Sequence, residues 1–168
     1  MQQDQITGYS EKLQIEKRYV TVTTKETLLE MVEAIEEASR ISLDTETTSL
    51  NPRKGKIIGF SITTKIGTGF YLPTLKWNNY TQKLEELLIE GKSTHNIAVR
   101  VMKMLKGKKL ICHNASFDLR YIKNYYGVSL IEDLWVDTAL LVHTVQEEGA
   151  GMGVFGLKPL AVSIQEHI

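Results

Sequence analysis

The order of apolar and polar residues predicts a chain that mixes strands and helices. Residues 18–24, RYVTVTT, alternate β-branched and polar side chains, which is typical of a half-buried strand. The segment LLEMVEAIEEASR then places four apolar residues on one helical face: Leu28, Met31, Val32 and Ile35. Thr23 and Glu26 stand three residues apart ahead of it, which is the spacing of a capping box. A strand followed by a capped helix is therefore expected.

Three closely spaced strands come next, over residues 40–47, 57–64 and 67–73. The turn NPRKGK separates the first two, with Asn51, Pro52 and Gly55 as its turn formers. Connections this short join antiparallel neighbours, so these strands should form a meander.

The remaining pattern alternates helices with strands. Helices are expected over about 80–90 and 94–106, a strand at KLICHN, a helix at SFDLRYIKNYY, a strand at LWVDT and a helix at ALLVHTVQ. A meander followed by such alternation predicts an α/β domain whose mixed sheet carries helices on its faces. Residues 1–17 are polar and aperiodic and should be a flexible lead-in, which leaves 18–168 as one domain.

Composition limits the partners and the cellular compartment that are expected for this domain. The formal net charge is zero and the isoelectric point is near 6.9, so no bulk field attracts nucleic acid or an anionic membrane. The single cysteine, Cys112, excludes an internal disulfide framework. No window approaches the roughly 20 apolar residues of a membrane-spanning helix, and the first residues are too polar for a signal peptide. A cytoplasmic protein without membrane association is expected.

Two carboxylates in the segment ISLDTETTSL suggest a metal site. Side chains alternate in a strand, so Asp44 and Glu46 point to one face and Thr45 to the other. Two neighbouring anions repel, and a divalent cation with a preference for oxygen ligands, Mg²⁺ or Mn²⁺, would relieve that repulsion. The alternative is a pair of solvated acids at the end of a strand.

A second segment, CHNASFDLRYI, adds one more acid. Asn114 and Asp118 stand four residues apart across the expected junction of a strand and a helix. Taken alone, Asp118 is an acid in a first helical turn, where the helix dipole favours it. Beside Asp44 and Glu46 it becomes a third candidate metal ligand.

These two segments carry a resemblance to a known family. The stretch LDTETTSLNPRKGKIIGFSITTKIGTGFYLP resembles the first motif, with its following hairpin, of the DEDD 3′–5′ exonucleases. The greatest similarity is to the proofreading domain of family A, DNA polymerase I-like, polymerases. NASFD is similar to the second motif, N-x-x-x-D, and VDTALL and FGLKPLA resemble later segments. The resemblance implies a ribonuclease H-like fold with helices on both faces of the sheet.

The resemblance also implies a mechanism. Asp44, Glu46 and Asp118 would hold two Mg²⁺ or Mn²⁺ ions about 4 Å apart for hydrolysis of the terminal phosphodiester at a single-stranded DNA 3′ end. Asp44 would bridge both ions, Glu46 would bind the ion on the nucleophile side, and Asp118 would serve the other.

Three further positions match substrate-contacting residues of the family. They are Thr47, Leu50 as a wedge against the terminal bases, and Asn114 near the terminal nucleotide. The alternatives are packing at the end of a strand for Thr47 and Leu50, and a turn former for Asn114.

The family pattern requires a fourth carboxylate, in Y-x-x-x-D or H-x-x-x-x-x-D, and neither pattern follows Asp118 in this sequence. Asp137 precedes an expected helix and is interpreted as a helix cap. We therefore expect the third motif beyond Ile168, in a longer protein with a polymerase domain C-terminal to this one. This fragment alone would then be weak or inactive.

Two other functions stay open at this point. A catalytically inactive module of the same fold could position DNA or serve as a structural element of the polymerase. A ribonuclease D-like or Werner-type exonuclease, acting on RNA or DNA, would carry the same three acids.

Overall fold

The computed structural model describes residues 17–145 of the 168-residue chain. Its strands are β1 (Arg18–Thr21), β2 (Arg40–Thr47), β3 (Ile57–Thr63), β4 (Thr68–Pro73), β5 (Leu75–Asn78), β6 (Lys83–Glu86), β7 (Leu88–Ile89), β8 (Lys92–Ser93), β9 (Lys109–Cys112) and β10 (Leu134–Asp137). Its helices are α1 (Lys25–Glu37), α2 (Thr94–Met104), α3 (Ala115–Tyr126), the 3₁₀ helix η1 (Ile131–Asp133) and α4 (Thr138–Val145). The expected lead-in over 1–17, apart from its last residue, and the segment FGLKPLA lie outside this range.

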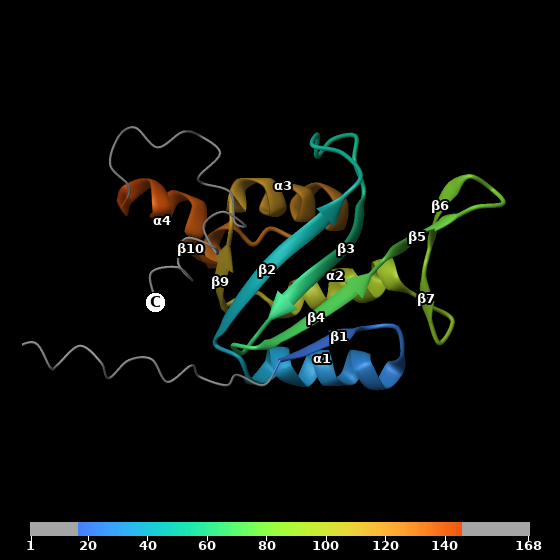
Figure 1. The fold of residues 1–168 in the computed structure, drawn as a ribbon, viewed down its shortest axis with the longest axis horizontal. Helices are drawn as coiled ribbons and strands as arrows, with labels where there is room; N and C mark the ends of the chain where they lie inside the picture. The colour runs from blue at the N-terminus through green and yellow to red at the C-terminus, as the bar shows by residue number, and fades with distance from the viewer. Residues whose placement is uncertain (1–16, 146–168) are drawn as a thin grey trace, which may run out of the picture.

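A six-stranded sheet organises the fold, in the order β1-β4-β3-β2-β9-β10 (Figure 1). Strands β2, β3 and β4 pair antiparallel, as the meander predicted. Strands β1, β9 and β10 each run parallel to their neighbours β4, β2 and β9. The mixed sheet expected from the sequence is therefore confirmed.

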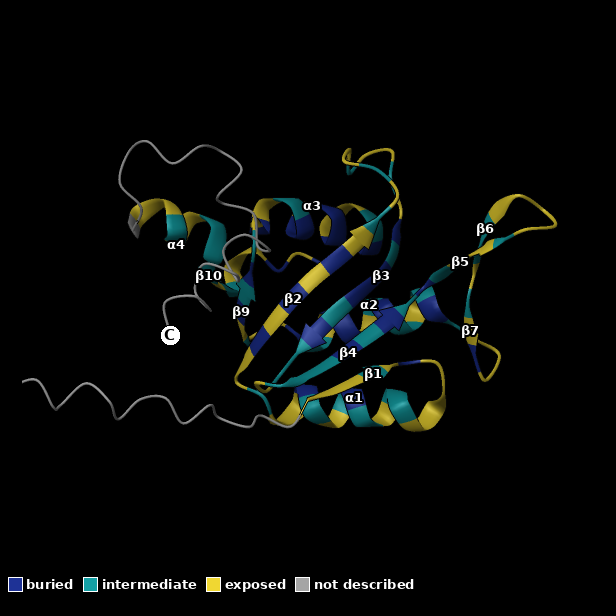
Figure 2. Ribbon diagram, viewed as in Figure 1, coloured by how far each residue is buried: buried dark blue, intermediate teal, exposed yellow. Residues whose placement is uncertain are grey.

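One face of this sheet is buried beneath α1, α2 and α3, which pack side by side (Figure 1). Ile41, Leu43 and Thr45 of β2 are buried against these helices, whereas Asp44 and Glu46 are exposed on the other face (Figure 2). This separation follows from the period of two along β2, because successive side chains in a strand point to opposite faces of the sheet. We call the face opposite α1, α2 and α3 the open face.

The helix predicted over residues 80–90 is wrong. That segment forms β6 and β7, which pair antiparallel with β5 and β8, and the β5–β6 hairpin extends away from the main sheet (Figure 1). Leu87, between the two strands, is held by neighbours outside the segment: its N–H donates to the Thr74 carbonyl oxygen, and its carbonyl accepts from Thr94 Oγ1 at 2.7 Å. Positive φ angles at Gln82 and Glu90 further break the helical path.

Helix α1 begins one residue later than the expected capping box. Thr24, rather than Thr23, is the N-cap, and its hydroxyl accepts from the Thr27 N–H at 3.3 Å. The Thr27 hydroxyl in turn accepts from the Thr24 N–H at 3.1 Å. The partner of the N-cap in the capping box, at position N3, is therefore Thr27 and not Glu26. Two of the free N–H groups at the helix start are thereby satisfied.

This geometry makes the two adjacent threonines a matched test. Thr24→Ala should lower the free energy of unfolding by about 1 kcal/mol, because the cap is lost. Thr23→Ala, at an exposed residue that is not the N-cap of α1, should change it by less than about 0.5 kcal/mol. Urea denaturation followed by circular dichroism measures both, and equal effects would show that the helix is capped elsewhere.

Candidate active site

The candidate site lies where β2 and β9 separate. Strand β2 pairs with β9 only from Arg40 to Ser42, while its pairing with β3 continues to Thr47. Beyond Ser42, helix α3 supplies the partner for β2 on this side. The Thr45 N–H donates to Asp118 Oδ1 at 2.9 Å, and Thr45 Oγ1 donates to the same oxygen at 2.5 Å. A helix residue thus takes the place of a neighbouring strand.

Asp118 is a buried acid, and burial is unfavourable for a charged carboxylate. It is only 2% exposed, and burial raises the pKa of its carboxyl to about 6. The two Thr45 hydrogen bonds oppose this increase by stabilising the carboxylate, and the charge of Asp44 adds to it. The effect of Asp44 places the two acids within electrostatic range, although they come from distant segments.

Asp44 and Glu46 lie on the open face, as their spacing predicted. Burial, followed by the charge of Glu46, raises the pKa of Asp44, and nearby His113 lowers it. The oxygen donors and the mutual repulsion of the acids both suit a hard divalent cation. In residues 17–145, however, no three His, Cys, Asp or Glu side chains are grouped closely enough to hold a metal ion. Asp44 thus interacts electrostatically with both Glu46 and Asp118, but the three acids do not form a complete metal-binding cage.

His113 is a site residue that the sequence did not single out. Its Nδ1 lies 2.9 Å from Thr138 Oγ1, and that hydroxyl donates to the Cys112 carbonyl oxygen at 3.2 Å. His113 directly follows the buried Cys112 at the end of β9, and it lies close enough to Asp44 to lower the pKa of that acid. Its position directly after an apolar strand was the available signal.

Asp137 is the helix cap that the sequence predicted, and it caps two helices. Its Oδ1 accepts from the Ala139 N–H at 3.0 Å and from the Asn114 N–H at 2.9 Å, and Oδ2 accepts from the Ala115 N–H at 2.8 Å. These bonds join the start of α4 to the start of α3. Cys112 beneath them is buried, and its burial raises the thiol pKa to about 12, consistent with a core residue.

The three expected substrate contacts occupy different settings. Leu50 is 88% exposed, so packing at the end of a strand does not explain it. Thr47 Oγ1 donates to the Ser49 carbonyl oxygen at 3.1 Å. Asn114 adopts the left-handed conformation at the N-cap of α3, with φ 61°, so the turn-former interpretation is confirmed. Its exposed side chain still allows a substrate contact.

The loop that carries Leu50 is fixed by a helix residue. The Tyr121 hydroxyl of α3 donates to the Ser49 carbonyl oxygen and to the Asn51 carbonyl oxygen, the latter at 3.2 Å. Gly55 leaves room for that hydroxyl, because a Cβ there would overlap the Tyr121 side chain unless the ring moved. Helix α3 therefore positions both Asp118 and the loop after β2.

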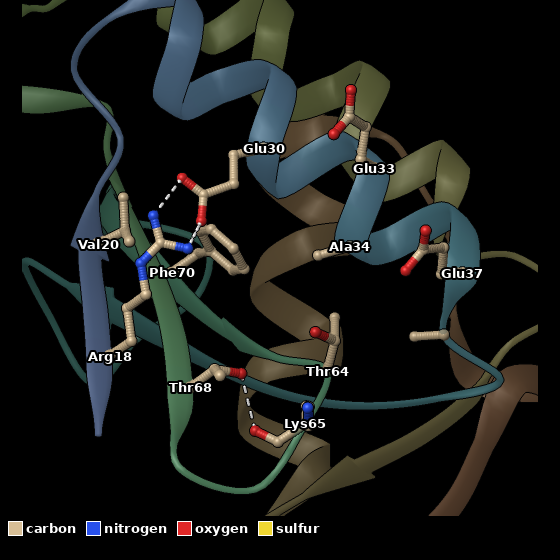
Figure 3. Close-up of a pocket in the computed structure, with 11 residues that line it drawn as sticks. Arg18, Val20, Glu30, Glu33, Ala34, Glu37, Thr64, Lys65, Thr68 and Phe70 are labelled. Carbon is tan, nitrogen blue, oxygen red and sulfur yellow. Dashed lines mark hydrogen bonds and ion pairs between the residues drawn. The ribbon is translucent and has the colours of Figure 1, made fainter. Parts of the chain in front are cut away.

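A separate cavity of about 470 Å³ lies on the helix side of the sheet, between α1 and strands β1 and β4 (Figure 3). Its wall includes the ion pair of Arg18 with Glu30, and the exposed Glu33 and Glu37 stand on the neighbouring turns of α1 (Figure 3). None of the acids expected at the active site lines it. This cavity is therefore distinct from the candidate site.

Comparison with known proteins identifies the family. A family model described as 3′–5′ exonuclease matches residues 19–163. The chain therefore belongs to the 3′–5′ exonuclease family, and the resemblance predicted from its two motifs is confirmed. A DNA polymerase I from Borreliella burgdorferi is 33% identical over 110 residues, which are 64% of this chain and 11% of that protein. The chain thus spans only a small part of this relative.

Solved structures share the fold. The POL domain of Pol1 from M. smegmatis aligns with a TM-score of 0.60 at 18% identity, over 89% of this chain and 23% of that one. Escherichia coli RNase D aligns with a TM-score of 0.58 at 17% identity, over 88% and 33%. The Nibbler EXO domain of Aedes aegypti gives 0.55 at 11% identity, over 80% and 63%. The fold is thus that of the ribonuclease H-like exonucleases.

None of the helices within residues 17–145 has the length and apolar character needed to cross a membrane.

The buried acid predicts a pH-dependent stability. Without divalent metal, the folded-state pKa of Asp118, about 6, exceeds its ordinary value of 3.8, so the folded chain retains the proton longer than the unfolded chain. The associated stability is present in full below pH 4 and is lost as the pH rises through 6, by at most about 3 kcal/mol. Asp118→Asn keeps an acceptor for Thr45 and should remove this decrease. Chemical denaturation in EDTA across that range measures both chains, and parallel curves would contradict the shift.

Proposed function

We propose that Asp44, Glu46 and Asp118 form the metal-dependent active site of a 3′–5′ exonuclease that removes nucleotides from single-stranded DNA ends. The observation that carries the proposal is the attachment of the buried Asp118 to Thr45, between Asp44 and Glu46. Two of the three acids share the open face of β2, and the third is bonded to the residue between them. Membership of the 3′–5′ exonuclease family supports this reading.

The chemistry of the donor set fits Mg²⁺ or Mn²⁺, two ions in the pattern of the DEDD exonucleases. Such ions, when bound, supply Lewis-acid activation of the attacking water and neutralise charge on the leaving 3′ oxygen. The chain's own contribution is to hold carboxylate oxygens in place. Thr45 fixes Oδ1 of Asp118, while β2 fixes the spacing of Asp44 and Glu46.

The substrate would be oriented by the residues around these acids. Leu50 projects from the loop held by Tyr121 and would act as a wedge against the terminal bases. Thr47, at the end of β2, and Asn114, at the N-cap of α3, would contact the terminal nucleotide. Contacts of this kind tolerate any base sequence.

We further propose that the complete protein is a cytoplasmic DNA polymerase I-like enzyme with a polymerase domain C-terminal to this one. The DNA polymerase I relative supports this partner. A fourth carboxylate would come from that longer chain, so the present 168 residues should be weak or inactive alone.

The decisive experiment measures trimming of end-labelled single-stranded DNA with Mg²⁺ or Mn²⁺. A chain extended to include the third motif should trim the 3′ end, and Asp44→Ala should reduce the rate by about a hundredfold or more, because a metal ligand is lost. The control is Glu33→Ala, which removes the same charge from an exposed residue of α1 away from the candidate site. Rapid trimming that survives Asp44→Ala would refute the proposal, and a matched RNA substrate tests the ribonuclease D-like alternative.

A second candidate is an inactive module that only positions DNA. It is favoured by the engagement of Asp118 Oδ1 with Thr45 and by the lack of a three-donor group in residues 17–145. Calorimetric titration with Mn²⁺ separates the two. Binding to the extended chain that is lost in Asp118→Asn supports the enzyme, whereas heat changes no larger than those of the buffer support the inactive module.

A further inference from the structure

Two cations and an aromatic ring meet at the beginning of β2 and β9. Arg40 and Lys109 are directly paired across these two strands. The Arg40 Cζ atom lies 5.3 Å from the centroid of the Trp135 ring, and the Lys109 Nζ atom lies 5.2 Å from it. Trp135 belongs to β10, where the pairing with β9 shifts register, and its side chain is 48% exposed. We call these three residues the basic end.

No acid within residues 17–145 forms an ion pair with the cations of the basic end. Like charges opposite each other on neighbouring strands destabilise a sheet. Over residues 17–145 the single ion pair present joins Arg18 to Glu30, so neither Arg40 nor Lys109 has a carboxylate partner there. The face of the Trp135 ring attracts both cations and holds their side chains in place. The arrangement thus presents two ordered positive charges to an anion.

The basic end and the acids share one face of the sheet. Arg40, Asp44 and Glu46 are all exposed and alternate with the buried residues of β2, so they point the same way. Asp44 stands four positions after Arg40, which is a distance of about 13 Å along β2. Strand β9 repeats the order, with Lys109 at its start and His113 just after its end, beside Asp44. The open face is therefore basic at the start of β2 and acidic toward its end.

We propose that the basic end binds backbone phosphates of the single-stranded DNA substrate, a few nucleotides upstream of the 3′ terminus held at the acids. This inference rests on the proposed function, because the acids fix where the terminus lies. Arg40 and Lys109 contact the phosphates, and Trp135 is a positioning residue that acts through them. A strand bound in this way meets phosphate-binding cations at one end and metal-binding carboxylates at the other.

The test is a binding measurement that needs no catalysis. Fluorescence anisotropy in EDTA follows a labelled oligothymidylate long enough to span the face, titrated with the 168-residue chain between about 50 and 200 mM salt. Arg40→Gln with Lys109→Gln should weaken binding by about tenfold per charge at the lower salt concentration and reduce the salt slope by about 1.4. The charge-matched control is Lys76→Gln with Lys83→Gln on the β5–β6 hairpin, which lies at the far side of the fold (Figure 1). It should leave both quantities nearly unchanged.

The role of Trp135 is tested by a conservative pair. Trp135→Phe keeps an aromatic face for both cations and should retain most of the affinity, whereas Trp135→Leu should weaken binding toward the level of the Arg40 and Lys109 variant. The chain has two tryptophans, so Trp77→Phe leaves Trp135 as the only one. Its emission should change on binding of the oligonucleotide but not on addition of inorganic phosphate at the same phosphate concentration.

Each outcome decides the proposal. Equal losses in the Arg40 and Lys109 variant and in the control, no binding of the oligonucleotide by the chain, or equal binding of inorganic phosphate would each overturn it. A failure of the proposed function looks different, because metal-dependent trimming would then be absent or insensitive to Asp44→Ala while Arg40-dependent and Lys109-dependent binding persists. Trimming with normal sensitivity to Asp44→Ala but unchanged binding in the Arg40 and Lys109 variant would reject the basic end alone.

Discussion

The attachment of Asp118 to Thr45 is the interaction on which the candidate site depends. It joins two segments 73 residues apart and closes the gap that opens where β2 leaves β9. A buried carboxylate is unfavourable unless it is hydrogen-bonded, and two donors from one residue compensate only in part, because the pKa stays raised. The same helix also fixes the loop after β2 through Tyr121. The position of α3 therefore sets the geometry of the acids and of Leu50 together.

Periodicity could predict most of the fold because most elements bury one face against their own neighbours. The strands β2, β3 and β4 and the helices α2 and α3 follow the expected patterns, and Gly127 ends α3 in the left-handed conformation. The segment 80–90 could not be predicted in this way. Its leucines have helical spacing, but the structure there is set by pairing with β5 and β8 and by the bonds of Thr74 and Thr94, all outside the segment. Long-range hydrogen bonds override local propensity here.

The same distinction applies to the candidate site: some of its features follow from local sequence pattern, and others depend on contacts between distant segments. The shared face of Asp44 and Glu46 follows from the period of a strand, and the capping role of Asp137 follows from its place before a helix. The second helix that Asp137 caps, the approach of His113 to Asp44 and the bond between Thr45 and Asp118 depend on the register between segments. The basic end depends on two such registers: the pairing of β2 with β9 and the register shift between β9 and β10 at Trp135.

The net charge of zero gives no sign of the basic and acidic ends of the open face, because a net charge is a sum and does not describe how charges are distributed. The acids at one end of the open face repel each other and also repel a phosphate, so a nucleic-acid end can approach them only after cations have reduced that charge. The cations at the other end repel each other for the same reason and gain from the phosphates of the strand. In the proposed function the two unfavourable clusters are complementary to two parts of one ligand. In that function, the physical cost of each cluster in the free chain would be the source of its affinity for metal at one end and for the DNA backbone at the other.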